Sequence, residues 1–405
     1  MDRTIHQSTV TGNSLRVRRR SVATLASVAA LCLFLSACSS SGSAATSSGS
    51  TSGSGGTAAG LDYAKRVVAQ YRAAVTKYPS PGPALDASKV AALKGKTILF
   101  VPISLAAGPF QQQLASLKTA FGHLGINVTT CDPKFLPSAA ATCLTNAKAN
   151  GAAAVISSGI PYALVANAYL ALEAAKIPVL VGSAGPGNPA STSDIAFQPG
   201  VTSSAKAGTV AVDETIAESG GKAHVLFVNI TDSTALTAQR DAMKAEFTKN
   251  CPGCTVVMDP FNTANISHVA TSVSSKLISN PSTNFLQLQA DAYVPNSLSG
   301  VQSANFTNKV KAVTGTASLG VLQMVQQKRF VTADVGYDFS YIGWNEADGA
   351  LRLLTGLPVN PEPFVPIRIF DAANLAGLSL TAGGIDSLYG PTSFKDMFYK
   401  NWGAA

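Results

Sequence analysis

Residues 96–128 read KTILFVPISLAAGPFQQQLASLKTAFGHLGINV, in which two apolar runs flank a longer mixed stretch. The first run, at 97–103, is rich in β-branched and aromatic residues without polar alternation, which is typical of a strand buried on both faces. Pro109 and Phe110 open the mixed stretch, whose apolar spacing predicts a helix up to residue 123. The segment therefore indicates a strand, a helix and a second strand of a parallel sheet.

The same alternation continues to residue 336. Further apolar runs predict strands at NVTTC (127–131), AAVISS (153–158), PVLVG (178–182), IAFQ (195–198), HVLFVNI (224–230), TVVMDPF (255–261), NFLQLQ (284–289), VKAVTG (310–315) and FVTADV (330–335), with helices between them. Because so many strands seldom share one sheet, the pattern favours two doubly wound parallel sheets that divide at 199–203.

After these two βα series, the pattern of residues 339–356 predicts another helix, and that of residues 364–370 predicts a final strand. This extra unit indicates that the chain crosses back between the lobes. We therefore predict an α/β fold of two doubly wound parallel-sheet lobes, joined by a multi-strand hinge and enclosing a cleft. Lobe 1 is expected to comprise residues 94–200 and 337–364, and lobe 2 residues 201–336 and 365–405.

The N-terminus has the composition of an export signal. A basic leader at 1–20 precedes the apolar run SVATLASVAALCLFLSAC at 21–38, whose core is shorter than the ~20 residues that span a bilayer. Its end, Leu35-Ser36-Ala37-Cys38, resembles the lipobox of bacterial lipoproteins, so residues 1–38 are predicted to be a lipoprotein signal with lipid on Cys38. An ordinary secretory signal is the alternative, and Arg18-Arg19-Arg20 leaves both the Sec and the twin-arginine route open.

The segment after Cys38 changes character twice. Residues 39–60 are rich in Ser and Gly and carry no charge, which predicts a flexible tether. Residues 61–93 predict a helical extension that ends at a cluster of prolines. Together these features place the folded part outside the cell, anchored by lipid to the outer face of the membrane.

The net charge of +8 arises from 30 Lys and Arg against 22 Asp and Glu in 405 residues. Five arginines and one acid lie within residues 1–20, so cleavage of the signal lowers the charge to +4. This is an ordinary charge for a soluble domain, and it does not indicate a nucleic-acid partner.

Four cysteines remain after Cys32 in the signal and Cys38 at the lipobox. They are Cys131, Cys143, Cys251 and Cys254. An even number outside the cell favours disulfides between neighbours in the sequence. The CPGC motif at 251–254 could instead suggest redox or zinc chemistry, but it has no second CxxC and no histidine near it.

Four segments together resemble type I periplasmic solute-binding proteins of ABC importers, in the ribose/galactose-type branch. They are residues 96–128, AAAVISSGIPYALVANAYLALEAAKIPVLVG (152–182), HVLFVNITDSTALTAQRDAMKAEF (224–247) and GWNEADGALRLLTGLPV (343–359). The resemblance covers about residues 94–375. It implies a monomeric protein without enzymatic activity, cofactor or metal. A small-molecule solute would close the lobes about the hinge, and the protein would then deliver it to ABC permease subunits.

Ligands of open α/β sheets bind beyond the carboxyl ends of the strands, so residues directly after predicted strands are candidates for the site. They are Ser104, Phe110, Gln111, Ser157, Ser158, Ser183, Thr231, Asp232, Phe261, Asn262, Asp291, Thr316, Tyr337 and Asp338. From these we expect the following to bind ligand: Phe110, Gln111, Ser158, Ser183, Phe261, Asn262, Asp291 and Tyr337.

The resemblance implies a role for five of them. In sugar-binding members, two aromatic residues sandwich the ligand, at positions matching Phe110 and Phe261. Polar residues bind its hydroxyls, at positions matching Ser158, Ser183 and Tyr337. Each has a structural alternative: core packing for the phenylalanines, helix capping for the serines and hinge conformation for the tyrosine.

The sequence departs from the sugar-binding pattern at two places. Those relatives carry an Asp-Arg pair after the fourth strand and an Arg at the first helix of the second lobe, which make charge-assisted bonds to hydroxyls. The corresponding stretches here read GSA at 182–184 and LTA at 236–238. A less polar or aromatic solute is therefore as compatible with the site as a sugar.

Signatures of other classes are missing from the sequence. The triplet GKT at 95–97 lacks the first glycine of a phosphate-binding loop, and SAGPGNPAST at 183–192 opens no helix. We therefore predict no enzyme. A solute-sensing receptor that signals to a membrane kinase or chemoreceptor is the alternative function, and a structural envelope lipoprotein without ligand is a third.

Overall fold

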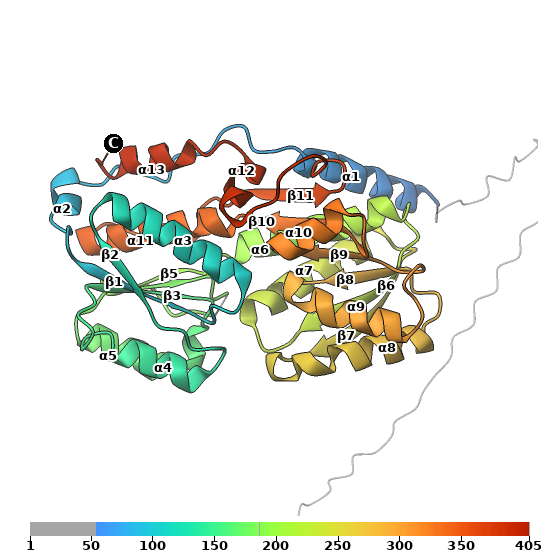
Figure 1. Ribbon diagram of the computed structural model, residues 1–405, viewed down its shortest axis with the longest axis horizontal. Coiled ribbons are helices and arrows are strands. Elements are labelled where there is room, and N and C mark those ends of the chain that lie inside the picture. Colours follow the sequence, from blue (N-terminus) through green and yellow to red (C-terminus); the bar gives the residue numbers. More distant parts are fainter. Residues whose placement is uncertain (1–53, 186, 405) are drawn as a thin grey trace, which may run out of the picture. The chain divides into compact units, whose positions relative to one another are not determined.

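A computed structural model describes residues 54–185 and 187–404 (Figure 1). The predicted signal, Cys38 and the tether up to residue 53 lie outside this part of the chain. Within it, the chain forms two α/β lobes, each with a parallel sheet covered by helices on both faces, as predicted. None of the helices described there is long and apolar enough to cross a membrane.

The first lobe contains a five-stranded parallel sheet in the order β2-β1-β3-β4-β5. Its strands are β1 (Thr97–Pro102), β2 (Asn127–Thr130), β3 (Ala154–Ser158), β4 (Val179–Gly182) and β5 (Ile195–Gln198). Ile98 and Phe100 face α3 (Gly108–His123) and α11 (Phe339–Thr355). Leu99 and Val101 face α4 (Pro137–Thr145) and α5 (Ala166–Ala174). Both faces are thus buried, which is why the strands are continuously apolar.

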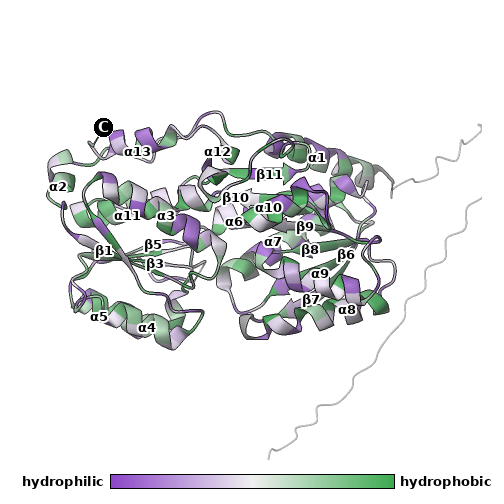
Figure 2. Cartoon of the chain, viewed as in Figure 1, coloured by the Kyte–Doolittle hydropathy of each residue, from purple (hydrophilic) through white to green (hydrophobic). Residues whose placement is uncertain are grey.

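The second lobe contains a six-stranded sheet in the order β11-β10-β9-β8-β6-β7. Its strands are β6 (His224–Ile230), β7 (Thr255–Phe261), β8 (Phe285–Leu288), β9 (Lys311–Gly315), β10 (Val331–Tyr337) and β11 (Ile367–Asp371). Helices α6 (Val201–Glu218) and α7 (Thr234–Asn250) cover one face, and α8 (Val269–Ser279), α9 (Val294–Ser303) and α10 (Leu319–Gln326) the other. Figure 2 shows β6 and β8 largely coloured as hydrophobic.

The last strand differs in direction from the rest of its sheet, whose other pairs of strands are parallel. β11 pairs antiparallel with β10 because the chain returns from the first lobe at the end where β10 leaves: Asp338 N donates to Pro366 O at 2.9 Å. The lobes are joined at Pro199–Gly200, at Asp338 and at residues 357–366. Gly200 adopts a left-handed conformation with φ of 65°, which glycine adopts without strain.

Both ends of the described chain depart from the predicted boundaries. α1 (Ser54–Arg72) begins inside the stretch predicted as tether, and a Cβ on Gly60 would lie 2.0 Å from Asn250 O, so glycine permits its contact with α7. α12 (Ile385–Tyr389) packs in lobe 2. Phe394 of α13 (Phe394–Asn401) packs in lobe 1, although residues 365–405 were all predicted to belong to lobe 2. The short α2 (Ala87–Ala91) also packs in lobe 1.

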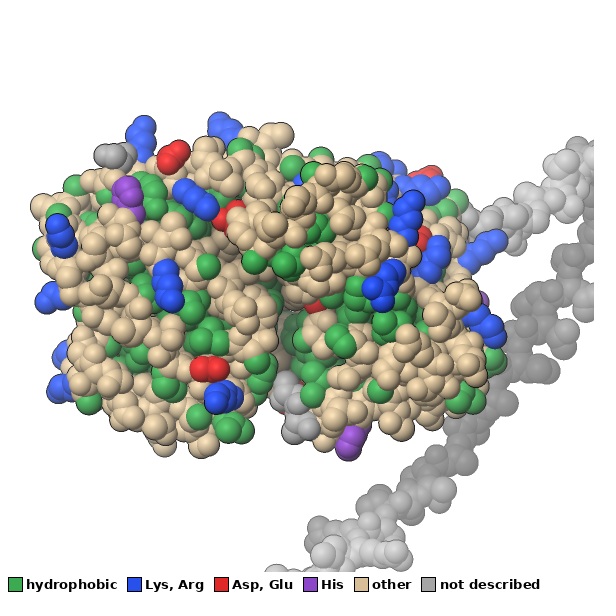
Figure 3. All heavy atoms as spheres, viewed as in Figure 1, with side chains coloured by type: hydrophobic (Ala, Val, Ile, Leu, Met, Phe, Trp, Pro, Cys, Tyr) green, Lys and Arg blue, Asp and Glu red, His purple; other side chains and the backbone are tan. Residues whose placement is uncertain are grey.

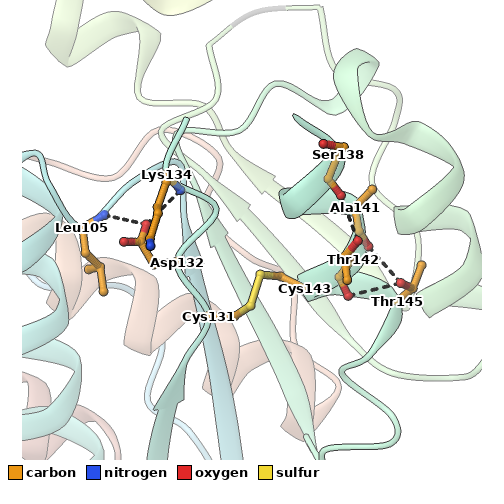
Figure 4. The surroundings of a disulfide bond; sticks show 9 residues. All are labelled: Leu105, Cys131, Asp132, Lys134, Ser138, Ala141, Thr142, Cys143 and Thr145. Atoms are coloured by element: carbon orange, nitrogen blue, oxygen red, sulfur yellow. Dashed lines mark hydrogen bonds between the residues drawn. A yellow bond between two sulfur atoms is a disulfide. The ribbon is translucent and has the colours of Figure 1, made fainter. Parts of the chain in front are cut away.

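The structure contains both predicted disulfides. Cys131–Cys143 joins the end of β2 to α4, with a Cα–Cα distance of 5.8 Å (Figure 4). Cys251–Cys254 links the end of α7 to the start of β7 at 5.3 Å. The pairing of sequence neighbours is therefore confirmed.

Candidate functional site

The loops at the carboxyl ends of the two sheets meet. Thr234 Oγ1, at the start of α7 in lobe 2, donates to Ala184 O, after β4 in lobe 1, at 2.8 Å. A Cβ on Gly185 would lie 2.4 Å from Ala235 N, so glycine permits this approach. Figure 3 shows the surface hollowed between the two lobes. In this fold class the edge beyond the strand ends is where ligands bind.

Aromatic side chains line this edge from one lobe to the other. The Phe110 ring lies 6.4 Å from Phe339, which lies 4.6 Å from Tyr337. In lobe 2, Phe261 and Tyr293 meet edge to face at 4.9 Å. Phe261 ends β7, Tyr293 follows β8 and Tyr337 ends β10, so all three lie at the carboxyl edge of the second sheet. We call these five residues the aromatic row.

Of the aromatic row, three residues were predicted from the sequence. Phe110, Phe261 and Tyr337 remain partly exposed, so their rings can contact a solute. Phe339 and Tyr293 are buried and were missed. Phe339 directly follows the predicted hinge residues Tyr337 and Asp338, and Tyr293 lies just after Asp291. Their closeness in sequence to these candidates could have indicated that they belong to the site.

The position of Phe110 depends on its surroundings in lobe 1. A Cβ on Gly159 would lie 2.6 Å from Phe110 Cζ, so glycine leaves room for the ring. The loop before α3 is held at Leu105, whose N–H donates to Asp132 Oδ1 at 3.0 Å (Figure 4) and whose carbonyl accepts from Gln111 Nε2 at 2.8 Å. Gln111 is exposed at the edge of the site but is engaged with its own loop.

Ser158 lies in the core of lobe 1 and not at the surface of the cleft. Its hydroxyl is fully buried, 2.7 Å from Glu346 Oε1 and 3.1 Å from Gln113 Oε1. A Cβ on Gly182 would lie 2.1 Å from Glu346 Oε1, so a glycine at the end of β4 accommodates the carboxyl group. In this structure Ser158 therefore serves packing and hydrogen bonding beneath the site.

Two more candidates serve the backbone of their loops. Ser183 has φ of 50°, and its N–H donates to Gln198 O at 2.9 Å, so it forms the turn that leads to the interlobe contact. Asn262 Oδ1 accepts from Asn265 N at 3.0 Å, which caps a short helical turn. Both remain partly exposed.

Asp291 belongs to a buried pair of carboxyl groups in lobe 2. Its oxygens accept from Thr314 Oγ1 at 3.1 Å and Ser318 N at 2.6 Å. Asp334 lies beside it and accepts from Ala317 N at 3.0 Å. Burial, and then the charge of Asp291, raise the pKa of Asp334 well above the ordinary value of an aspartate. These groups fix the loops after β8 and β9.

Two buried carboxyl groups near the hinge predict a dependence of stability on pH. Burial raises the pKa of Glu346 and of Asp338 to about 8 in the folded chain. In the unfolded chain both ionise near pH 4, so the folded state holds more protons between about pH 4 and pH 8. Their stabilising contribution is complete below pH 4 and is lost as the pH rises to about 8.

We therefore expect the unfolding temperature to fall by several degrees between pH 5 and pH 8. Calorimetry of Glu346→Gln should show a weaker dependence, since an amide cannot ionise. Glu362→Gln, at an exposed glutamate, is the matched control and should behave as the parent protein. An unfolding temperature that stays constant in the parent protein would contradict this prediction.

Among residues 54–185 and 187–404, no group of three or more His, Cys, Asp or Glu is arranged to hold a metal ion. The arrangement found there is an aromatic surface between two lobes, with serine, threonine and amide groups at its edges. Such a surface can contact a small molecule through its apolar faces and close around it.

No protein-family model matches the chain, and no curated protein matches it in sequence. Solved structures are similar in fold. One is a 5-methylthioribose transporter solute-binding protein from Thermotoga lettingae, in complex with 5-methylthioribose, at 14% identity and a TM-score of 0.64, covering 77% of this chain and 98% of that chain. Another is GanP, a glucose-galactose binding protein from Geobacillus stearothermophilus, at 14% identity and 0.61, covering 70% and 99%.

A sugar ABC transporter protein from Yersinia enterocolitica is similar at 15% identity and a TM-score of 0.61, covering 81% of this chain and 100% of that chain. At these identities the similarity shows the fold. The two lobes thus have the fold of type I periplasmic binding proteins, which confirms the predicted fold class.

Proposed function

We propose that the chain is an extracytoplasmic solute-binding protein that captures a small molecule between its lobes and delivers it to an ABC permease. The aromatic row carries this proposal, because it continues from lobe 1 through the hinge to lobe 2 at the edge where the fold binds ligands. Solved structures of the same fold are named as sugar-binding transport proteins, which supports it.

The proposed mechanism is closure of the lobes. A solute that touches Phe110 in lobe 1 and Phe261 in lobe 2 makes contacts that exist only when the lobes are together. Its binding energy therefore shifts the population toward the closed form. The contact of Thr234 with Ala184 would add to the stability of that form.

The proposed solute is a sugar or a similar molecule with an apolar face. Aromatic rings pack well against such faces. The charged pair typical of sugar-binding relatives is replaced by Gly182, Ser183 and Ala184, and the nearby Asp291 is buried with its own partners. We therefore propose that the aromatic row contributes more to affinity than charge-assisted hydrogen bonds do.

A thermal-shift screen against sugars, polyols, aromatic acids and nucleosides tests the function. A ligand present at 100 times its Kd should stabilise the fold by about 2.7 kcal/mol, which raises the unfolding temperature by a few degrees. If no compound in any of these classes shifts the melting of a well-folded sample, solute binding is contradicted.

For a ligand found in this way, we expect Phe110→Ala and Phe261→Ala each to weaken binding about tenfold, since each removes aromatic contact worth roughly 1–1.5 kcal/mol. Isothermal titration calorimetry measures the change. Ile278→Ala is the control, because Ile278 is 64% exposed on α8 and lies outside the aromatic row and its loops. Unchanged affinity in both row variants would remove the row from the binding site.

We also propose that the protein is a monomer held to the outer face of the membrane by lipid on Cys38. The lipobox-like sequence and the Ser/Gly-rich stretch after it support the lipid anchor. Mass spectrometry of the mature N-terminus checks it, and an unmodified Cys38 within an uncleaved chain would contradict it.

A further inference from the structure

In the part of the chain that the structure describes, two segments besides the three hinge crossings connect the lobes. Residues 73–86 lead from α1 on lobe 2 to α2 on lobe 1, and residues 390–393 lead from α12 to α13 in the same direction (Figure 1). They lie side by side: Val75 N donates to Tyr389 O at 2.8 Å, and a Cβ on Gly390 would lie 2.5 Å from Val75 O. We call residues 73–86 and 390–393 the terminal strap.

The strap is fastened to both lobes. On lobe 2, Arg72 at the end of α1 pairs with the buried Glu214 of α6 at 2.9 Å. On lobe 1, Asn401 Nδ2 donates to Gly82 O, and Leu85 N donates to Asn401 O, both at 2.8 Å. Because hydrogen bonds and buried apolar residues hold both ends, the strap must respond when the lobes move.

The strap lies on the opposite side of the hinge from the candidate site. Tyr337 and Phe339 belong to the aromatic row, but Asp338 and Tyr341 face the strap. The ring of Tyr78 stacks on Tyr341 at 5.2 Å with an angle of 13° between the planes. The Tyr78 hydroxyl oxygen would lie 2.8 Å from a Cβ on Gly390, so glycine in the strap leaves room for it.

The space behind the hinge is filled by rings from three segments. Phe394, just after the strap, lies 5.2 Å from Tyr78 and 5.0 Å from Tyr341. Tyr78 is 8% exposed and Phe394 is 2% exposed, so the rings are closely packed. Tyr341 and Phe394 belong to lobe 1, and Gly390 beside the Tyr78 hydroxyl directly follows α12 of lobe 2. If the lobes separate at the site by rotation about the hinge, Tyr78 would be compressed between these two sides. Close-packed side chains resist that compression.

We propose that the terminal strap limits how far the lobes can open in the absence of ligand. In this proposal the ring of Tyr78, packed behind the hinge, resists wider opening. This regulates the site of the proposed function and rests on it only in assuming that the lobes move. When the lobes of the free protein open only over a narrow range, ligand binding restricts their motion less and costs less conformational entropy. The affinity for the solute is therefore higher, which favours capture at low solute concentration.

The test measures the separation of the lobes without ligand. Spin labels are placed at Ala171→Cys on α5 and Ser275→Cys on α8, both exposed, in the full chain with Cys32→Ser and Cys38→Ser. Double electron–electron resonance gives the distance distribution. We expect Tyr78→Ala to add a population at longer distance, and Tyr78→Phe, which keeps the ring, to match the parent.

Phe306→Ala is the matched control, because Phe306 is similarly buried at 7% exposed but packs in the core of lobe 2 and has no contact with the strap rings. It should leave the distribution unchanged. If Tyr78→Ala does not fold by circular dichroism, four Gly and Ser residues inserted between Thr76 and Lys77 loosen the strap instead. An unchanged distribution in the folded variant would overturn the proposal. The result is independent of whether any solute is found.

Discussion

Replacing Arg352 with methionine is expected to lower the free energy of unfolding by about 3–5 kcal/mol, because it leaves a buried carboxylate without its partner. Arg352 is 3% exposed, and its Nε donates to Asp348 Oδ2 at 2.6 Å. Its Nη2 donates to Pro83 O at 3.0 Å, and Trp402 Nε1 donates to Asp348 Oδ1 at 2.9 Å. The pair thus joins α11 to Pro83 in the terminal strap and to Trp402 after α13.

Urea denaturation measures the change. Lys311→Met is the matched control: Lys311 pairs with Glu218 at 3.0 Å but its side chain is 54% exposed, so a loss below about 1 kcal/mol is expected. Asp348→Leu combined with Arg352→Met should recover part of the stability, since no unpaired charge remains. A loss in Arg352→Met as small as in the control would contradict the argument.

The strands of both sheets could be predicted because each is specified by the apolar pattern of its own residues. Phe100 and Val101 face opposite sides of the first sheet and are both buried, so an unbroken apolar run is the expected pattern. Tight disulfides between Cys131 and Cys143 or Cys251 and Cys254 were predictable for the same reason, since each pair is close in sequence.

The site was only partly predictable, since position after a strand does not determine where a side chain points. Ser158 turns into the core because Glu346, which lies 188 residues away, accepts its hydrogen bond. Asp291 is likewise held by Thr314 and Ser318. Such partners come together only in the folded chain, and no local pattern in the sequence reveals them.

The placement of the chain ends depended on distant contacts in the same way. The ring of Trp402 stacks on Trp344 of α11 at 5.8 Å with an angle of 12° between the planes. This contact, with Phe398, holds α13 in lobe 1, although β11 before it belongs to lobe 2. The sequence contains both tryptophans but does not show that they meet.

The disulfide between Cys131 and Cys143 is expected to contribute about 3 kcal/mol to stability, because it closes a loop with a sequence separation of 12. It also fixes the loop that positions the first lobe's side of the site. Asp132, next to Cys131, accepts from Leu105 N and from Lys134 N, each at 3.0 Å (Figure 4). Lys134 and Phe135 adopt φ of 54° and 63°, conformations that cost energy for these residues and need support from the surrounding structure.

We therefore expect the double variant Cys131→Ser with Cys143→Ser to unfold at a lower urea concentration than the parent protein. Its amide hydrogens at residues 132–136 and 103–107 should also exchange faster. Cys251→Ser with Cys254→Ser is the control, since its separation of 3 closes a much shorter loop and should cost less, without effect on that exchange. Equal losses in the two pairs would show that loop length does not set the contribution. Residues 103–107 lead directly into α3, which carries Phe110. Unchanged exchange at these residues would therefore show that the disulfide does not influence the position of Phe110.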